Sequence, residues 1–589
     1  QTLQDTAAAV FVLNHEDIRR SGATSIPEVL RLVPGVQVAR LYGHAWAITS
    51  RGFISTFSNK LLVLIDGRSV FSPLFSGVYW DIQNVMLEDV DRIEVVRGSG
   101  GATWGANAVN GVINIITKSA HATQGGLLVA GGGNDEKGFG AGRYGFALGE
   151  NGAARIYAKG FSRKDANSRN PGAVPNWKEQ RGGFRADWDW GKQQAMLDGA
   201  IYSGSESAVS TIFQPNFNNP VVTYAAKTSG GHLLGRWQDD GLSLQVYVDR
   251  TKRERLTFSE SRNTMDIEAK YRFSPFKNHD IQLGLGYRRT HDNIPGTFGL
   301  SFTPISRTDY LYSSFIQDQM SLSRDVDLTL GAKFEHNDYS GLEWAPTARL
   351  MWRASENHRI WAAYSRAYVP PSRADRSLQE KFVNSPGFQM GLVPSPNMQT
   401  THMTAYELGY RGNFGSRWSV DATVFLNDYR LLPTIETLPF KAGFLGLQSA
   451  NFLNARAYGS EWSVRTQLTP DWRLTAAYTW LLIHGTRTGG NDTTTVTEFA
   501  APRNQWSLNS AWDMSDTLTL DAQYYWMGRL DLKPVIKSYQ RLDLRLGWKP
   551  VNGIEASLTV QNALNHKHAE AWRKNIYGRS FYAKIVWTF

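Results

Sequence analysis

The spacing of apolar residues along the chain changes near Gln124. From there to the last residue, apolar side chains occupy every second position in stretches of about ten residues. One example is Leu518–Trp526, in which apolar and aromatic residues alternate with largely polar ones. Because successive side chains of a strand point to opposite faces, this spacing predicts strands with one apolar face and one polar face.

Short turns separate these stretches in pairs, and longer polar connections join one pair to the next. The turns are expected near residues 149–152, 189–192, 238–241, 274–280, 323–325, 354–358, 412–417, 469–472, 513–516 and 549–553. With both chain ends on the same side, ten short turns give about 22 antiparallel strands, enough for a barrel with a filled lumen. The pattern is typical of a transmembrane β-barrel.

The first 120 residues have a different, mixed α/β pattern. Asn14 is expected to cap a short helix over 15–20, and Ser25 with Glu28 is expected to form the capping box of a second helix. Leu61–Ile65 and Arg68–Phe71 flank an Asp-Gly pair, which predicts two strands joined by a tight turn. These signals predict a small globular domain.

A glycine-rich stretch runs from Val90 to Thr117. Two β-branched runs, Ile93–Val96 and Val112–Thr117, enclose five glycines, which predicts two strands joined by tight bends. The glycines alone would also suit a phosphate-binding loop. No Gly-Lys-Ser/Thr follows them and no long amphipathic helix comes next, so a nucleotide site is disfavoured.

Composition excludes several classes of protein. The 589 residues include no cysteine, which rules out disulfides, thiolate metal sites and cysteine nucleophiles. No apolar run approaches the roughly 18 residues of a spanning helix. The net charge of +10 comes from dispersed basic residues, which suit lipopolysaccharide phosphates, an anionic ligand or a solvated surface better than nucleic acid. A nucleophile elbow is absent, so no enzyme is predicted, and composition alone would also allow a soluble all-β protein.

The glycine-rich stretch resembles the end of the plug domain in TonB-dependent outer-membrane receptors. The resemblance is carried by Glu94–Gly98 and Trp104–Thr117, with further matches at residues 34–36, 50–53 and 63–67. It implies a plug domain over residues 1–122, filling a 22-stranded antiparallel transmembrane β-barrel over 123–589. It also implies a monomer in the outer membrane of a Gram-negative bacterium, surrounded by lipid and lipopolysaccharide.

The resemblance further implies active transport of a small-molecule substrate, driven by a TonB-like protein at the periplasmic face. No cofactor and no metal site are predicted. The expected TonB box is not evident at Gln1–Asp5, and a signal peptide is also lacking, so both are expected to have stood upstream.

Two strand segments, Tyr406–Tyr410 and Tyr458–Glu461, match the receptor family, and each carries a glutamate among apolar and aromatic residues. The resemblance implies that Glu407 and Glu461 meet two plug arginines, Arg51 and Arg97. Buried charges can share a site only when each is paired. The alternative is a set of separate surface ion pairs, which would stabilise little.

Substrate contacts are expected from two plug loops that face outward. The candidate residues are Arg40, Tyr42, His44, Trp46, Phe71, Phe75, Tyr79 and Trp80. An aromatic rim with few charges suits an iron–siderophore chelate, and it would equally suit a corrinoid. The alternative is that half of these rings pack the plug against the barrel.

A ferric siderophore complex is therefore the predicted substrate, with cobalamin or copper as alternatives. Met390, Met398, His402 and Met403 suggest a soft metal. The resemblance disfavours haem, because haem receptors of this family carry a histidine in the region that corresponds to 372–394, and none occurs there. A passive porin or a surface adhesin is the alternative of a different class. A porin has no reason to fill its lumen.

The last nine residues alternate as a strand that faces lipid on one side. Phe581, Ala583, Ile585, Trp587 and Phe589 are expected on the lipid face. The terminal aromatic, Phe589, resembles the assembly signal of outer-membrane barrels.

Overall fold

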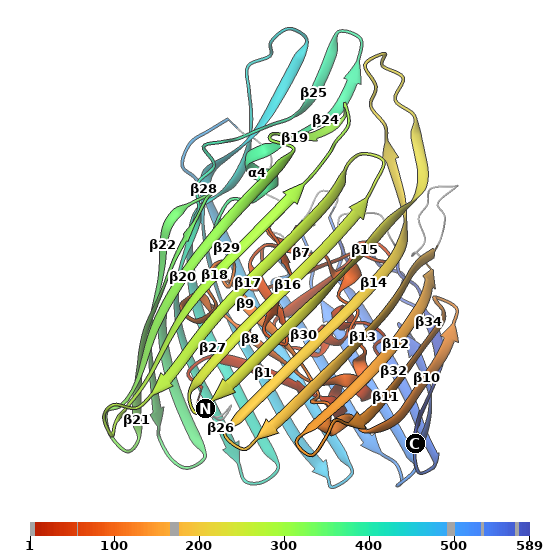
Figure 1. Ribbon diagram of the computed structural model, residues 1–589, viewed down its shortest axis with the longest axis vertical. Helices are drawn as coiled ribbons and strands as arrows, with labels where there is room; N and C mark the ends of the chain where they lie inside the picture. The colour runs from red at the N-terminus through yellow and green to blue at the C-terminus, as the bar shows by residue number, and fades with distance from the viewer. Residues whose placement is uncertain (1–5, 56, 165–175, 492–500, 532–534, 572–575) are drawn as a thin grey trace.

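The computed structural model describes residues 6–55, 57–164, 176–491, 501–531, 535–571 and 576–589. Figure 1 shows the N-terminal elements, in red, inside a barrel whose strands run from orange to blue. Gln1–Asp5, where the sequence shows no evident TonB box, lie outside the described residues. Among the helices of the described ranges, none is long and apolar enough to cross a membrane.

The barrel is closed and has 22 antiparallel wall strands among the described residues, as predicted. The last strand pairs with the first, from Leu127 opposite Thr588 to Gly133 opposite Tyr582. The wall strands are β10 (Gly125–Gly133), β11 (Glu136–Ala147), β12 (Gly152–Lys164), β13 (Asn176–Trp190), β14 (Gln193–Thr211), β15 (Val221–Asp239), β16 (Leu242–Glu254), β17 (Ser259–Phe273), β18 (His279–Asn293), β20 (Ser306–Ser321), β21 (Val326–Asn337), β22 (Gly341–Arg353), β23 (His358–Val369), β26 (Thr401–Phe414), β27 (Trp418–Thr437), β28 (Phe444–Thr469), β29 (Trp472–Arg487), β30 (Asn504–Asp513), β31 (Leu518–Met527), β32 (Tyr539–Val551), β33 (Ile554–Gln561) and β34 (Ser580–Thr588).

All ten predicted short turns join consecutive wall strands, and they lie along the lower edge of Figure 1, here called the short-turn end. In the described residues, the opposite, long-loop end carries three extra strands and a helix outside the wall. They are β19 (Leu300–Phe302), α4 (Arg373–Ser377), β24 (Leu378–Ser385) and β25 (Phe388–Val393). They are excluded from the wall because β18 pairs directly with β20, and β23 with β26.

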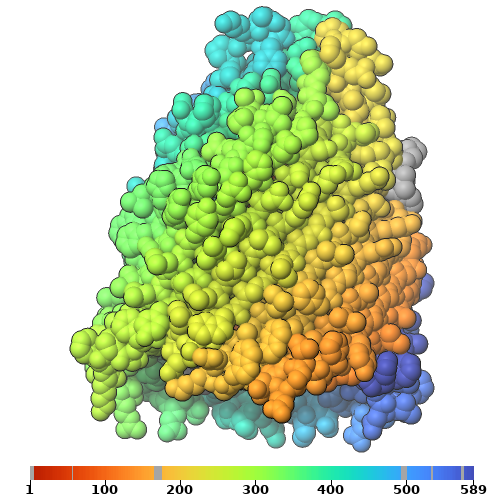
Figure 2. Space-filling model, in the orientation of Figure 1, coloured from red at the N-terminus to blue at the C-terminus, as the bar shows by residue number. Residues whose placement is uncertain are grey.

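The alternation of residues gives the wall two different faces. On β16, Leu244, Val246 and Val248 are exposed on the outside, while Gln245 and Tyr247 are buried against the interior. Figure 2 shows the outer face of one side of the wall as an unbroken layer of side chains. A polar inner face lets the lumen hold a polar domain, and an apolar outer face suits lipid.

The interior domain is built on a five-stranded sheet with the order β1-β8-β9-β4-β5. Its strands are β1 (Ala9–Asn14), β8 (Val90–Arg97), β9 (Gly111–Thr117), β4 (Leu61–Ile65) and β5 (Arg68–Ser69). Two small hairpins accompany it, β2 (Val36–Arg40) with β3 (Trp46–Ser50) and β6 (Phe71–Ser72) with β7 (Gly77–Val78). The helices are α1 (His15–Arg20), α2 (Ile26–Val29) and α3 (Gly101–Trp104), with 3-10 turns η2 (Leu30–Leu32), η3 (Trp80–Ile82), η4 (Leu87–Asp89) and η5 (His121–Thr123).

The glycine-rich stretch forms two antiparallel strands, as predicted, because β8 pairs with β9 across the α3 bend. The strand–turn–strand at 61–71 is also confirmed. Asp66 and Gly67 both have positive φ, which is the conformation of a two-residue hairpin turn. The second strand of this hairpin is shorter than expected and ends at Ser69.

One of the two predicted helix caps is wrong. Asn14 caps α1, accepting a hydrogen bond from the Asp17 amide as expected. Ser25, in contrast, makes no side-chain bond to α2. The Glu28 carboxylate is instead bound by Arg31, at 2.9 Å, and by the Trp46 indole, at 3.0 Å. A buried carboxylate gains more from a guanidinium than from the amide at a helix start, so the capping box does not form.

The seam between β34 and β10 ends at Phe589. Its backbone exchanges hydrogen bonds of 3.0 and 2.6 Å with Gly126. Phe581, Ile585, Trp587 and Phe589 are exposed on the outside, which confirms the predicted lipid face. The role of Phe589 as an assembly signal stays a prediction.

We predict that Gly133→Val weakens this seam. A Cβ at Gly133 would overlap the Phe581 carbonyl oxygen, whereas a Cβ at Gly138, on the neighbouring strand, would meet nothing within 4 Å. Overpacking of this kind typically costs about 1–3 kcal/mol. Gly133→Val should therefore lower the temperature at which the folded barrel loses its fast migration on a gel, and Gly138→Val should not. Equal behaviour of the two variants would contradict a tightly packed seam.

Candidate functional site

Four charged side chains meet between the interior domain and the barrel wall. Arg51 Nη1 lies 2.6 Å from Glu407 Oε1, and Arg51 Nε lies 3.2 Å from Glu461 Oε1. Arg97 Nη1 lies 3.1 Å from Glu461 Oε2. The Glu461 side chain is only 1% exposed. The structure thus brings the four predicted residues into one buried set, with Glu461 shared by both arginines.

Local backbone conformation positions this set. Arg51 has a positive φ of 56°, which is uncommon for a residue with a Cβ and points its side chain toward the wall. Its guanidinium also lies 4.1 Å from the centre of the Phe425 ring. Gly35 passes close to Glu461, and a Cβ there would lie 3.0 Å from the carboxylate. Burial alone would lower the pKa of Arg51, but the two carboxylates raise it above its ordinary value, so the group stays charged.

A second inter-domain cluster was not predicted. Arg31 Nη2 lies 2.8 Å from Glu570 Oε2, on the connection between β33 and β34, and Arg541 Nη1 lies 3.2 Å from Glu28 Oε2. Burial would raise the pKa of Glu28, but Arg31 and Arg541 hold it well below its ordinary value. Glu570 also accepts a hydrogen bond from the Arg40 amide. No sequence signal reveals this cluster, because its partners are about as far apart in the chain as possible.

The glycine-rich bend after α3 is held by a third contact. Glu335, on β21, accepts hydrogen bonds from the Ala106 amide, at 2.8 Å, and from the Tyr368 hydroxyl. Gly105 passes against the same carboxylate with a φ of 86°, where any Cβ would overlap it. The glycine is therefore required by the close approach of the wall.

Two of the eight candidate substrate residues are core residues. Trp46 and Trp80 are 6% and 7% exposed and belong to the main hydrophobic cluster, in which Trp46 contacts Trp177 of the wall. Arg40 donates to the carbonyl groups of Tyr42 and Gly43, so its guanidinium stabilises the loop that follows it in the chain.

The other candidates lie nearer the long-loop end. Tyr42 stacks on His44, and His44 Nε2 lies 3.3 Å from Glu206 Oε2 on β14. The Tyr79 hydroxyl donates to Glu260, at 3.0 Å. The structure thus ties both predicted loops to wall strands β14–β17.

An exposed aromatic residue, Phe57, was missed by sequence reasoning. It is 57% exposed, in an interior domain whose large side chains are mostly buried. Its ring lies 5.2 Å from Phe75, and Phe75 lies 4.7 Å from Tyr79, so the three form a row. The only available signal was a single aromatic residue in a polar loop, which is weak.

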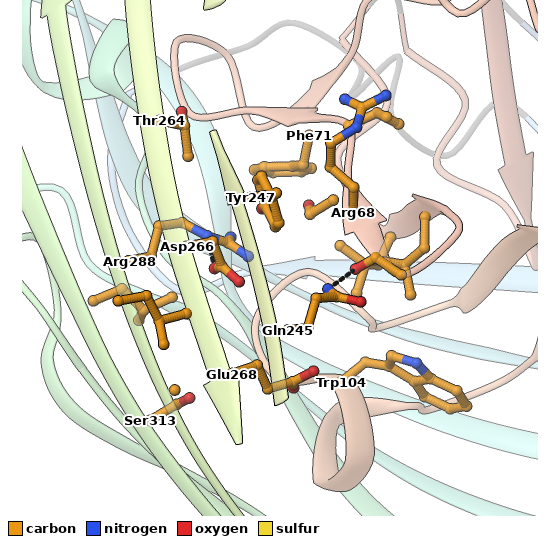
Figure 3. Close-up of a pocket in the computed structure, with 18 of the residues that line it drawn as sticks. Arg68, Phe71, Trp104, Gln245, Tyr247, Thr264, Asp266, Glu268, Arg288 and Ser313 are labelled. Carbon is orange, nitrogen blue, oxygen red and sulfur yellow. Dashed lines mark hydrogen bonds and ion pairs between the residues drawn. The ribbon is translucent and has the colours of Figure 1, made fainter. Parts of the chain in front are cut away.

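A cavity of about 850 Å³ lies between the interior domain and the inner faces of β15–β21. It extends from the β15–β16 turn, at Asp240, to Tyr339 beyond the outer end of β21. Figure 3 shows Arg68 and Phe71 of the interior domain facing Tyr247, Asp266 and Arg288 of the wall across it. Nowhere in the described ranges do three His, Asp or Glu side chains gather as a metal site would require.

We predict that Glu461→Ala destabilises the interior domain. Removing Glu461 leaves Arg97 without its nearest carboxylate, and breaking a buried pair typically costs about 3–5 kcal/mol. Glu407→Ala should cost less, because Arg51 keeps Glu461. Calorimetry should show an earlier transition for the interior domain with the barrel transition unchanged. Glu356→Ala, in an exposed turn, is the control, and a shift no larger than that control would mean that the set contributes nothing.

Comparison with known proteins agrees with this architecture. The family described as TonB dependent receptor-like, beta-barrel matches residues 120–563, and the TonB-dependent receptor plug domain matches residues 2–112. The chain is 28% identical to the vitamin B12 transporter BtuB of Photobacterium profundum over 61% of the chain and 65% of that protein. It is 24% identical to the ferric enterobactin receptor of Pseudomonas aeruginosa, over 89% and 81%.

Two solved structures share the fold across the whole chain. A ferric enterobactin receptor from Pseudomonas aeruginosa superposes with a TM-score of 0.81 at 16% identity, covering 100% of this chain and 99% of that one. The siderophore receptor PirA of Acinetobacter baumannii gives 0.80 at 17%, covering 98% of each. Members of the family are transporters and receptors, which confirms the prediction that this chain is not an enzyme. The chain therefore belongs to the TonB-dependent receptor family and is a transporter of the Gram-negative outer membrane, its barrel closed by a plug domain.

Proposed function

We propose that this transporter imports an iron–siderophore chelate, captured at the long-loop end between the plug and the loops. The observation that carries the proposal is the aromatic row Phe57, Phe75 and Tyr79, whose outermost ring is exposed. The short turns of outer-membrane barrels face the periplasm. The row lies nearer the opposite, long-loop end, so it faces the outside of the cell. Exposed aromatic faces suit a chelate whose surface is largely organic.

Two arginines, each paired with a carboxylate, lie beside the row. The Arg253 guanidinium is 4.0 Å from the centre of the Tyr79 ring and 2.8 Å from Asp81, which fixes its position. Arg255, just beyond the outer end of β16, is partly exposed and forms an ion pair with Glu206. Because Arg253 lies over the Tyr79 ring, the ring left for a ligand to stack on is the exposed Phe57. An aromatic ligand that also carries negative charge suits a ring with guanidinium groups nearby, and catecholate chelates have both properties.

A corrinoid is the second candidate. Relatives named as vitamin B12 transporters support it, as does a row of rings that would accept a flat macrocycle. A corrinoid does not require a positively charged partner, so the arginines beside the row distinguish the two candidate ligands. A siderophore should depend on Arg255, and cobalamin should not.

The transport step is proposed to start at the plug's N-terminal strand. Arg411 donates to the carbonyl groups of Thr6 and Ala8 near the short-turn end, within reach of a periplasmic partner. β1 pairs with β8 over six residues, and β8 ends at Arg97. A pull by a TonB-like protein would therefore load the buried charge cluster directly. The cavity along β15–β21 offers the ligand a route beside the plug.

The ligand assignment predicts that Phe57→Ala weakens binding. Truncating a ring at a binding hot spot typically costs about 2 kcal/mol, roughly thirtyfold in affinity. Phe276, 67% exposed in a short turn, is the matched control. Calorimetric titration should use ferric enterobactin and cyanocobalamin as probes. Binding of cyanocobalamin alone would overturn the iron assignment, and equal effects of Phe57→Ala and Phe276→Ala would overturn the site.

The route predicts that Ser313→Trp slows uptake without changing affinity. Ser313 lines the cavity, while Ser314, the next residue, lies on the opposite face of β20. Ser314→Trp places the same ring outside the cavity and serves as the control. Uptake of radiolabelled iron by cells should fall severalfold for Ser313→Trp only. Unchanged uptake in that variant would exclude this side of the plug as the path.

A further inference from the structure

The lipid-facing surface of the barrel has a groove over β22, β23, β26 and β27. It has a volume of about 590 Å³. Its lining includes Leu328, Leu350, Tyr364, Tyr406, Leu408 and Val424. The groove exists because two residues on this surface are small. Ala348 lies opposite Tyr364, and Ala362 lies between Leu350 and Leu408, where neighbouring positions carry large side chains.

The outward residues of the same strands become polar one step further toward the long-loop end. There Arg366, His402, Thr404, Asp428 and Arg430 line a second cavity of about 320 Å³, which shares Tyr364 with the groove. Arg366 lies opposite Thr404, and His402 lies opposite Arg430. The groove and the polar cavity therefore form one continuous feature along the strands.

Two rings mark the boundary between its halves. Tyr364 and Tyr406 lie opposite each other, with centroids 5.5 Å apart. Aromatic residues gather where the apolar band of a barrel meets the headgroup region. The groove thus lies at acyl-chain depth, and the polar cavity lies at the level of the outer headgroups.

Two arginines, Arg366 and Arg430, line the polar cavity. The Arg430 side chain is 72% exposed, and its nearest carboxylate, Asp428, lies 3.7 Å away. Arg366 lies over the Trp344 ring at 5.4 Å, and within the described part of the chain it has no ion-pair partner. His402 is already engaged by Glu343, at 3.0 Å. Asp428 thus faces Arg430 and Glu343 faces His402, which leaves Arg366 as the arginine of this cavity without a carboxylate partner in the described ranges.

An amphiphile with an acyl chain and a phosphate group fits both halves at once. We infer that this face binds a phosphate-bearing glycolipid of the outer leaflet, as found in lipopolysaccharide. One acyl chain lies in the groove beside Ala362, and a phosphate lies between Arg366 and Arg430. A free phosphate would leave the groove empty, and a glycerophospholipid of the inner leaflet would sit at the short-turn end.

Native mass spectrometry of the purified full chain tests this with diphosphoryl lipid A as the probe. Arg366→Ala with Arg430→Ala, and separately Ala362→Trp, should each weaken lipid A binding at least tenfold. Arg250→Ala with Arg289→Ala removes two exposed, outward arginines on β16 and β18, away from the groove, and should leave binding within twofold. Heat-modifiable migration confirms that each variant is folded.

Three results would overturn the inference. Equal loss in the Arg250/Arg289 control would show a diffuse charge effect. Unchanged binding in Ala362→Trp, together with competition by inorganic phosphate, would show a simple anion site. Equal affinity for phosphatidylglycerol and lipid A would show a surface without preference for the glycolipid. None of these outcomes depends on the transported ligand.

Discussion

A charge buried between the plug and the barrel must have a partner, and the interface is arranged around this requirement. The inner face of a wide barrel is polar, so the plug cannot be held by an apolar contact alone. Glu461 serves two plug arginines, and Glu28 and Glu570 neutralise a second group of arginines nearer the long-loop end. Such pairs are weak evidence for stability, but breaking one leaves a costly charge. They fix the position of the plug more than they add to its stability.

An interface of this kind suits a domain that must move during transport. An apolar interface resists separation because its surfaces are costly to wet. Ion pairs and hydrogen bonds can exchange partners with water, so each contact can be released in turn. The pairing of β1 with β8 leads from the N-terminal strand to Arg97, so the same strand that receives a force also ends in the charge set. The plug can therefore be held rigidly at these contacts and still be released from them reversibly.

The wall was predictable from sequence because the bilayer imposes a period of two on every strand. The ten turns followed from that period, and Arg51, Arg97, Glu407 and Glu461 followed from motifs. The structure brings these four together, although their role in transport remains a proposal. Glu570, Glu335 and Phe57 were not predictable, since pairing between distant segments leaves no local pattern. The capping box at Ser25 failed for a related reason, because Arg541, far along the chain, also binds Glu28.

Strand β26 lies between two different environments, the plug-filled lumen and the lipid bilayer. Glu407 points inward to an arginine, while Tyr406 and Leu408 point to lipid. A slip of β26 by one residue would place a carboxylate in hydrocarbon and two large apolar side chains against the plug. Either misplacement alone would cost free energy, and a slip by one residue would cause both. The lumen and the bilayer therefore favour the same alignment of β26 independently. The register that assembles the barrel is also the register that seats the plug.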